Sequence, residues 1–421
     1  MRKNKGKNKL IKKRVIFLVI LIVIIIGSYS LIKNKKDIPD KNLMIDVVNK
    51  DINTSKELLD KYKLDIEIKY EYDDKVEKDK VISQSINVGT DLNENDKLVL
   101  VVSLGKIDKE KLASDKINEL GKVPIMMYHG IKDMTNSETS YTGGNVDKDG
   151  YTRTAEAFRN DLENYYQKGY RMIKLSSYID GIIDVEYGYS PIILTFDDGN
   201  ANNINVMGLD NEGNIIIDKN SAVGILEEYK KKYPDYNVTA IFFVTDALFN
   251  QPEYNDKILK WLVDNNYEIG NHTKNHNNFG KIDTSKTQEV VGYMYQKLDG
   301  IIGDKYQKIV ALPFGSPYKK EHENYKYILN GEYNGEKYNT KAALRVGWEP
   351  EVSPFNKEFD MTFLKRCRAY DNNGKEFDIE MILKMLDTTR YISDGNIDTI
   401  VTSSKNEELI NKDTNREIIL Y

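Results

Sequence analysis

The stretch Pro-Ile-Ile-Leu-Thr-Phe-Asp-Asp-Gly at residues 191–199 decides the fold of the larger part of this 421-residue chain. Its first half is apolar, which predicts a buried strand. Two carboxylates, Asp197 and Asp198, follow where that strand should end. Because active groups in parallel β/α folds lie at the carboxyl ends of the strands, the stretch predicts a functional site as well as a strand.

A second stretch, His-Thr-Lys-Asn-His at residues 272–276, follows another short strand pattern that ends at Gly270. The chain has four histidines, and two of them stand four residues apart here. Two imidazoles and one carboxylate at strand ends make a ligand set with open positions, which suits a catalytic zinc or a similar divalent ion. A second carboxylate beside the first can act as a base without being a ligand.

Apolar runs alternate with amphipathic runs between residues 123 and 405. This alternation predicts a parallel α/β architecture, and the length suits a distorted (β/α) barrel. An insertion at 206–218 is expected to form a β-hairpin near the metal side. Strands are expected at 192–195, 239–245 and 308–312 and before Gly270, and helices at 222–233, 254–266 and 286–302.

The first residues predict a membrane anchor. Residues 1–14 carry eight Lys and Arg and no acid, and residues 15–32 are mostly apolar and uncharged, about the ~20 residues that span a bilayer. We therefore expect a basic cytoplasmic tail, a single-pass anchor at 15–32 and an outward-facing remainder at the cell membrane. A cleaved signal peptide is the alternative, with Ser-Tyr-Ser at 28–30 as a weak cleavage site.

The charge argues against a nucleic-acid-binding protein, and the cysteine content excludes a protein held together by disulfides within the chain. Removing the eight positive charges of residues 1–14 from the net charge of −5 leaves −13 on the remainder. Nucleic-acid binding needs clustered Lys and Arg, so no nucleic-acid partner is expected. Cys367 is the only cysteine, so no disulfide within the chain is possible.

Residues 38–106 predict a small α+β module. A Thr-Ser-Lys-Glu capping box at 54–57 predicts the start of a helix, and strands are expected at 66–70, 81–85 and 98–102. The module resembles a PASTA domain in Val-Ile-Ser-Gln-Ser at 81–85, Gly-Thr at 89–90 and Val-Val-Ser-Leu-Gly at 101–105, with Ile86 where that family usually has Pro. The resemblance implies binding to peptidoglycan or muropeptides, and a spacer is the alternative. Residues 107–122 are charged and are expected to be a helical linker.

Residues 123–405 resemble a polysaccharide deacetylase of the NodB-homology type, carbohydrate esterase family 4. The resemblance rests on Thr-Phe-Asp-Asp-Gly at 195–199, His-Thr-Lys-Asn-His at 272–276 and, in part, Leu-Pro-Phe-Gly at 312–315. It implies one divalent metal ion, with Zn²⁺ expected, bound by Asp198, His272 and His276. It further implies that Asp197 is the base and that the backbone N–H of Phe314 stabilises the oxyanion. Pro313 and Trp348 are expected to contact the sugar.

Two positions depart from the family pattern. The arginine that normally orients the base is replaced by Ala311, and Arg366 is expected to take its place, with Arg345 behind it. The family's C-terminal histidine, its general acid, has no counterpart after His322. Asp394 is expected to fill that role, or Asp197 to carry the proton itself, while a structural role at the barrel rim is favoured for His129.

The sequence therefore predicts a membrane-anchored, metal-dependent hydrolase that removes N-acetyl groups from a cell-wall glycan, with peptidoglycan favoured. One alternative is an O-deacetylase of another surface polysaccharide. The other is a non-catalytic glycan-binding or wall-sensing protein that keeps the metal site. Residues 406–421 are expected to form a C-terminal tail.

Overall fold

The computed structural model describes residues 42–421, which divide into two compact units at the boundary between Lys106 and Ile107. The predicted basic tail at 1–14 and the anchor at 15–32 lie outside the described residues. Among residues 42–421, no helix combines the length and the apolar character needed to cross a membrane.

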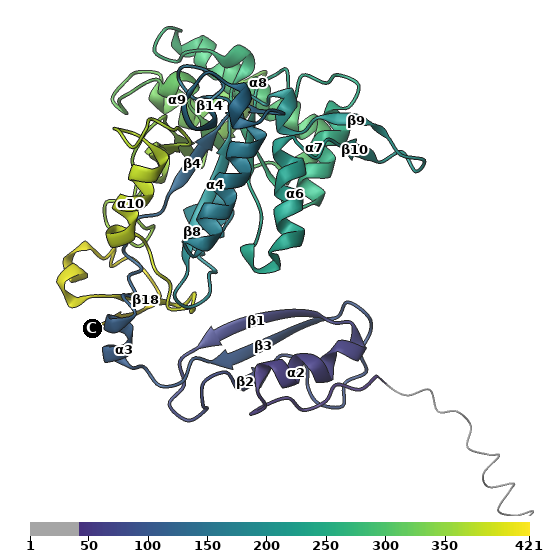
Figure 1. The fold of residues 1–421 in the computed structure, drawn as a ribbon, viewed down its shortest axis with the longest axis vertical. Helices are drawn as coiled ribbons and strands as arrows, with labels where there is room; N and C mark the ends of the chain where they lie inside the picture. The colour runs from purple at the N-terminus through teal and green to yellow at the C-terminus, as the bar shows by residue number, and fades with distance from the viewer. Residues whose placement is uncertain (1–41) are drawn as a thin grey trace, which may run out of the picture. The chain divides into compact units, whose positions relative to one another are not determined.

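The smaller unit is a three-stranded sheet with one helix, as predicted (Figure 1). Strand β3 (Lys97–Ser103) lies in the middle, parallel to β1 (Asp65–Glu71) and antiparallel to β2 (Val81–Gln84). Helix α2 (Ile52–Leu59) begins before the predicted capping box, because the Asp51 carboxylate accepts hydrogen bonds from the backbone N–H groups of Asn53 and Thr54. The prediction of Thr54 as the cap is therefore wrong.

The larger unit is an α/β structure in which most strands are followed by helices (Figure 1). Its helices are α3 (Lys109–Ser114), α4 (Ala155–Gln167), α5 (Leu175–Ile179), α6 (Ala222–Lys232), α7 (Asn255–Asp264), α8 (Thr284–Ile302), α9 (Tyr325–Leu329) and α10 (Ile379–Thr389). Its main-sheet strands are β4 (Ile125–Tyr128), β7 (Tyr170–Met172), β8 (Ser190–Phe196), β11 (Ile241–Val244), β12 (Glu268–Asn271), β13 (Ile309–Ala311), β16 (Ala342–Leu344) and β17 (Cys367–Arg368). The two-stranded pairs are β5 (Ile131–Lys132) with β6 (Arg153–Thr154), β9 (Val206–Leu209) with β10 (Ile215–Ile217), β14 (Asn330–Tyr333) with β15 (Glu336–Asn339), and β18 (Thr399–Thr402) with β19 (Glu417–Leu420).

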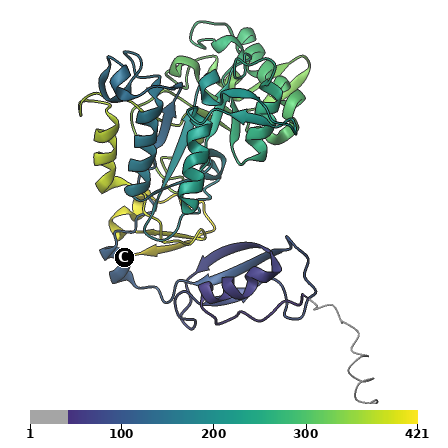
Figure 2. The ribbon, with the colours of Figure 1, turned by 45° about the vertical axis from the view of Figure 1, so that its right-hand side comes forward.

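The main sheet is parallel throughout and has the order β16-β13-β12-β11-β8-β4-β17, with β7 also paired to β8. A parallel bridge between Leu344 and Leu364 connects the edge strand β16 with the extended chain that leads into the other edge strand, β17. The sheet thus nearly closes on itself, and helices α4, α6 and α10 run along its outside (Figure 2). The predicted α/β fold with a parallel sheet is confirmed.

Local sequence accounts for these elements. All seven residues of β8 are buried, as expected for a strand covered on both faces. Side chains that accept hydrogen bonds from backbone N–H groups mark the helix starts, which satisfies donors that the helix itself leaves unpaired. These caps are Thr154 for α4, Ser221 for α6, Asp283 for α8 and Asp378 for α10.

The two segments predicted as linker and tail pack into the larger unit. The backbones of Asn118 and Ile392 form a bridge, and the Glu119 side chain is buried. Strand β19 near the C-terminus pairs with β18. The linker was predicted from its charge, whereas burial of a few apolar side chains such as Ile117 and Ile410 ties both segments to the core.

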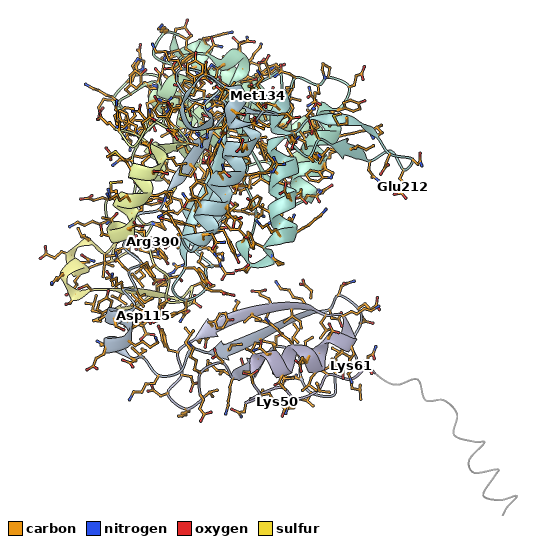
Figure 3. All side chains as sticks on the ribbon, in the orientation of Figure 1. Lys50, Lys61, Asp115, Met134, Glu212 and Arg390 are labelled. Carbon is orange, nitrogen blue, oxygen red and sulfur yellow. The ribbon has the colours of Figure 1, made fainter. Side chains whose placement is uncertain are left out.

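The predicted hairpin is formed by β9 and β10 and projects from the larger unit, with Glu212 at its far tip (Figure 3). Its side chains Met207, Leu209 and Ile216 are exposed. The hairpin begins soon after Asp198, and Asn205 at its base donates a hydrogen bond to Asp218, which fixes its two ends together.

Candidate active site

Four strands of the main sheet lead to one pocket. β4 leads to His129, β8 to Asp197, β12 to His272 and β13 to Phe314. Since these strands are parallel and Tyr128 pairs with Phe196, their carboxyl ends meet at one edge of the sheet. The pocket there has a volume of about 250 Å³, and it is lined by His129, Tyr151, Asp197, Asp198, His272, His276, Leu312, Phe314 and Val346.

Asp198, His272 and His276 form a group that could hold a metal ion. One ligand atom from each lies within 4.8 Å of the others. The Nε2 atoms of His272 and His276 lie 3.3 Å and 3.4 Å from the same Asp198 carboxylate oxygen, Oδ1. His272 Nδ1 lies 2.8 Å from the Ala311 carbonyl, which can only accept, so Nδ1 carries the proton and the lone pair of Nε2 faces Asp198. That arrangement is the usual one for a metal-binding imidazole.

Several pocket residues adopt backbone angles that side chains rarely take. Positive φ angles occur at Asp198 (74°), His276 (49°) and Phe314 (59°). Such conformations cluster at functional sites, where the surrounding structure maintains them. Gly199 (φ 64°) is required at the end of the first motif, because a Cβ there would lie 2.1 Å from the Leu248 carbonyl oxygen.

Asp197 is fixed by an arginine that immediately precedes the edge strand β17. Arg366 Nη1 and Nη2 each donate to one oxygen of the Asp197 carboxylate at 2.7 Å, and Nη1 also donates to Thr195 Oγ1 at 3.1 Å. Asp197 is 2% exposed and Arg366 is fully buried. Burial alone would raise the pKa of Asp197, but the Arg366 guanidinium holds that pKa below its usual value. The carboxylate therefore stays ionised and oriented.

The predicted contact between Arg366 and the base is present, and the second candidate does not make it. Arg345 contributes its carbonyl oxygen, which accepts a hydrogen bond from Arg366 Nε at 3.1 Å. The Arg345 guanidinium instead lies over the Phe363 ring, 5.3 Å from its centroid. The arginine missing at Ala311 is thus replaced spatially by one that lies 55 residues later in the chain.

Replacing Arg366 by methionine is expected to destabilise the protein by about 3–5 kcal/mol, because it leaves the buried Asp197 carboxylate uncompensated. The free energy of unfolding from urea titrations at neutral pH measures this loss. Since Arg366 lowers the pKa of Asp197, the stabilisation is present above the unfolded value of ~3.9 and is lost as the pH falls through the folded value. The double variant Asp197→Asn/Arg366→Met should be less destabilised than Arg366→Met. Equal losses would show that Arg366 stabilises through packing alone.

The expectation that Asp394 is the general acid is contradicted by its position. Its Oδ2 accepts a hydrogen bond from Thr399 Oγ1 at 2.7 Å, and its backbone N–H donates to Glu119 Oε1. Glu119 precedes β4, so this group lies at the amino end of a strand whose carboxyl end leads to the pocket. Asp115 lies near Glu119 in the chain, and Met134 follows the carboxyl end of β4. Figure 3 shows these two residues at opposite ends of the larger unit. Burial is the largest cause that raises the pKa of Glu119, and the nearby charge of Asp394 raises it further.

His129 lies in the pocket, although the sequence favoured a structural role at the rim. Its ring packs edge-on against Tyr151 with centroids 4.7 Å apart. Its Nδ1 is buried and has no hydrogen-bond partner in the described part of the chain. Burial lowers the pKa of His129, and the carboxylates of Asp197 and Asp198 oppose that effect. The position of His129 directly after the apolar strand β4 is the sequence signal that could have found it, whereas Tyr151 carried no signal.

Of the predicted oxyanion donor Phe314 and the predicted sugar-contacting residues Pro313 and Trp348, only Phe314 lines the pocket. Phe314 lines the pocket, is 55% exposed and packs against His276 with ring centroids 4.6 Å apart. Pro313 is buried and does not line the pocket. Trp348 is exposed and contacts Phe377, and it follows the lining residue Val346 by two positions.

Comparison with protein families assigns both units. Residues 185–328 match the family model described as polysaccharide deacetylase, and residues 43–104 match that of the PASTA domain. The chain therefore carries a polysaccharide deacetylase domain and a PASTA domain. The deacetylase match includes Asp197, Asp198 and the two histidines, whereas His129 and Arg366 fall outside it. No curated protein matches the sequence.

Three solved structures of low identity are similar to parts of this chain. The Streptococcus pyogenes deacetylase PplD in complex with acetate is 17% identical, with a TM-score of 0.44 over 62% of this chain and 97% of that one. A de-N-acetylase from Aggregatibacter actinomycetemcomitans is 15% identical, with a TM-score of 0.38 over 58% and 94%. The three-PASTA-domain of a Ser/Thr kinase from Staphylococcus aureus is 16% identical, with a TM-score of 0.14 over 31% and 81%.

Proposed function

We propose that this protein is a metal-dependent hydrolase that removes N-acetyl groups from a cell-wall glycan. The observation that carries the proposal is one pocket that combines the cluster of Asp198, His272 and His276 with the arginine-bound carboxylate of Asp197. A site that only bound metal would have no need of a second, separately oriented carboxylate. The match to the polysaccharide deacetylase family supports a glycan substrate.

The three ligands fit a divalent ion such as Zn²⁺. Two imidazole nitrogens directed at one carboxylate oxygen provide a nitrogen- and oxygen-rich site with open positions. An ion held there would polarise the acetamide carbonyl and lower the pKa of a bound water from 15.7 towards ~7.

Asp197 would accept the proton of the attacking water. Its salt bridge to Arg366 keeps it ionised and prevents it from turning away. The backbone N–H of Phe314, at the rim of the pocket, would donate a hydrogen bond to the oxyanion that develops on the acetamide oxygen. A preorganised donor of this kind contributes a few kcal/mol to the transition state, roughly 10²–10³-fold in rate.

His129 would protonate the amine as it leaves. The sequence assigned this role to Asp394 or Asp197, but Asp394 lies at the other end of the sheet and Asp197 already serves as the base. His129 is the one pocket histidine outside the metal cluster among the described residues, and its buried Nδ1 has no partner. The family's arginine and its general-acid histidine are absent from the sequence motifs, and that absence favoured a non-catalytic alternative. Arg366 and His129 would supply these two groups in the pocket.

Replacing His129 by alanine is expected to lower amide turnover by about 10²-fold or more, the usual scale for general acid catalysis, while the metal content is kept. An activated aryl acetate should still be hydrolysed, because its phenolate leaves without a proton. His322→Ala, which changes a histidine outside the pocket, is the matched control and should leave both rates unchanged. Equal loss on the amide and on the aryl ester would contradict the role of acid.

Peptidoglycan is the favoured substrate and the outer face of the cell membrane the favoured location. The PASTA match supports cell-wall glycan binding by the smaller unit, and the apolar run at 15–32 supports an anchor. Binding of glycan to an isolated fragment of residues 42–106 tests the first point. Partition of the full chain into membranes tests the second.

Acetate release tests the proposed function. The purified protein is incubated with N-acetylglucosamine oligosaccharides and with peptidoglycan, and both acetate and new free amines are measured. Equal amounts of the two support N-deacetylation, and a chelator should stop the reaction until Zn²⁺ is restored. Acetate without amine would indicate an O-deacetylase. No acetate from any glycan, with the metal bound, would favour the binding or sensing role.

A further inference from the structure

A second arginine lies close to the arginine that holds the base, at the end of the edge strand β17. Arg368 ends β17, two residues after Arg366, and pairs with Met127 of β4. Arg366 immediately precedes β17, and Cys367, between the two arginines, packs into the hydrophobic core. Arg366 reaches Asp197. Arg368, two residues further along the chain, lies nearer the carboxyl ends of the strands, where the pocket is.

The Arg368 guanidinium is held between two aromatic rings. Its central carbon lies 4.7 Å from the ring centroid of Tyr151 and 4.9 Å from that of Tyr370. Tyr151 lines the pocket and packs against His129. Contacts of this kind are attractive, and they fix the plane of a guanidinium without using its hydrogen-bond donors.

Arg368 has no acidic partner. No carboxylate in residues 42–421 lies within 4.0 Å of the Arg368 guanidinium, the distance that defines an ion pair. The buried Nη2 of Arg368 has no hydrogen-bond partner in the same residues. Arg366 and Arg153, by contrast, each form a short ion pair with a buried aspartate. An unpaired guanidinium beside a pocket leaves donors available for a ligand.

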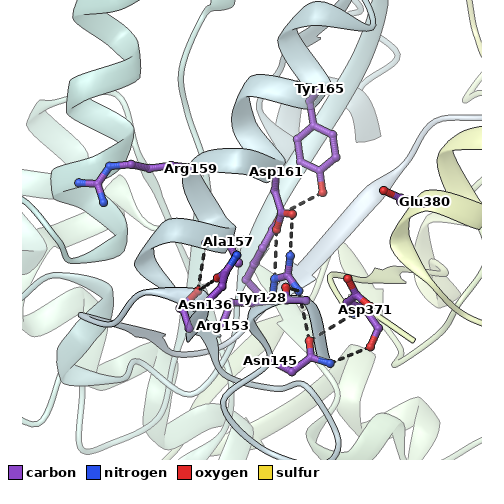
Figure 4. Close-up of polar contacts among 12 residues, drawn as sticks. Tyr128, Asn136, Asn145, Arg153, Ala157, Arg159, Asp161, Tyr165, Asp371 and Glu380 are labelled. Atoms are coloured by element: carbon purple, nitrogen blue, oxygen red, sulfur yellow. Dashed lines mark hydrogen bonds and ion pairs between the residues drawn. The ribbon is translucent and has the colours of Figure 1, made fainter. Parts of the chain in front are cut away.

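The loops that hold Arg368 are built rigidly. Arg153 binds Asp161 through two nitrogens and Asn145 through a third, and Asn145 in turn donates to the carbonyl of Asp371 at 2.7 Å (Figure 4). These bonds tie the loop that carries Tyr151 to the loop that carries Tyr370. The two loops also touch directly, because a Cβ on Gly150 would lie 2.3 Å from the Tyr370 ring. A preformed clamp of this kind lowers the entropy lost on binding.

We propose that Arg368 binds a negatively charged substituent, a carboxylate or a phosphate, on the glycan next to the sugar that loses its acetyl group. The inference rests on the proposed function and names the substrate class of the same pocket. Both pocket carboxylates are neutralised, Asp197 by Arg366 and Asp198 by the ion it would bind, so an anion on the substrate meets no uncompensated negative charge. Guanidinium groups recognise carboxylate and phosphate oxygens in pairs.

Binding and turnover of three oligosaccharides test the proposal. They are a neutral N-acetylglucosamine tetramer, peptide-free glycan strands with a lactyl carboxylate on alternate sugars, and the tetramer with a 6-phosphate. Dissociation constants are measured by calorimetry on the inactive Asp197→Asn/Arg366→Met protein, in which neither charge of that ion pair remains, and acetate release on the wild type. We expect the charged oligosaccharide to bind better than the neutral one. Arg368→Gln should weaken that binding about tenfold or more, the scale of a hydrogen bond to a charged group, and leave the neutral tetramer unchanged. Whichever charged oligosaccharide loses affinity shows whether Arg368 binds a carboxylate or a phosphate.

Arg159→Gln is the matched control, because that guanidinium pairs with Glu228 and points away from Arg153, Asn145 and Asp371 (Figure 4). Equal weakening of charged and neutral oligosaccharides by Arg368→Gln would overturn the proposal and leave Arg368 as a packing residue. So would a wild type that does not prefer charged oligosaccharides. Selective binding through Arg368 without acetate release from any of the three would instead reject the proposed function and keep the anion site.

Discussion

Asparagine in place of Asp197 is expected to lower deacetylation by about 10²-fold or more while the protein keeps its divalent ion. The substitution preserves shape and removes the basic oxygen. The metal group of Asp198, His272 and His276 does not include Asp197, so metal content should not change. Acetate release under saturating substrate gives the rate, and elemental analysis of the dialysed protein gives the metal content.

The Asp197→Asn protein should also be less stable, because Arg366 is fully buried and loses its charged partner. Rates are therefore compared well below the melting temperature of each protein. Asp210→Asn, at the exposed tip of the β9–β10 hairpin, is the matched control and should behave as wild type. Loss of the ion in Asp197→Asn would mean that the two carboxylates have exchanged roles. Full activity would remove Asp197 as the base.

The parts of the fold that the sequence predicts correctly are those with local signals. The run at 191–199 forms β8 and its loop, and the amphipathic run at 286–302 falls within α8. Asp198, His272 and His276 come together because parallel strands place their carboxyl ends side by side, which is a property of the fold class. The replacement of the arginine at Ala311 by Arg366 was also accessible, since a buried base needs a partner and few arginines follow it.

The parts that the sequence does not predict depend on long-range packing. Glu119 looks like one charged residue in a polar segment, yet its side chain accepts hydrogen bonds from Tyr391 and from the backbone of Val401, more than 270 residues away. Asp394 lies where the family's C-terminal motif is expected, but its backbone N–H donates to Glu119, so it belongs to that same buried group. Tyr151 reaches the pocket only because Asn145 and Arg153 shape its loop. None of these contacts leaves a periodic or local pattern.

Alanine in place of His272 is expected to reduce the metal content of the purified protein from about one ion per chain to near zero. His272 is the buried member of the cluster, and its Nδ1 bond to the Ala311 carbonyl aims Nε2 at Asp198. The two ligands that remain, Asp198 and His276, are partly exposed and can turn towards water. Loss of one of three protein ligands therefore removes both a bond and the order of the site.

Metal content after dialysis and the rise in melting temperature on adding Zn²⁺ measure this loss without reference to activity. An ion at 100 times its dissociation constant stabilises the folded state by about 2.7 kcal/mol, so the wild type should show a clear shift and His272→Ala none. His322→Ala, outside the cluster, should keep both the ion and the shift. Because His129 is also absent from the cluster, His129→Ala should retain the ion as well. Full metal retention in His272→Ala would reject the assignment of this pocket as a metal centre, and with it the route by which Asp197 could activate a water.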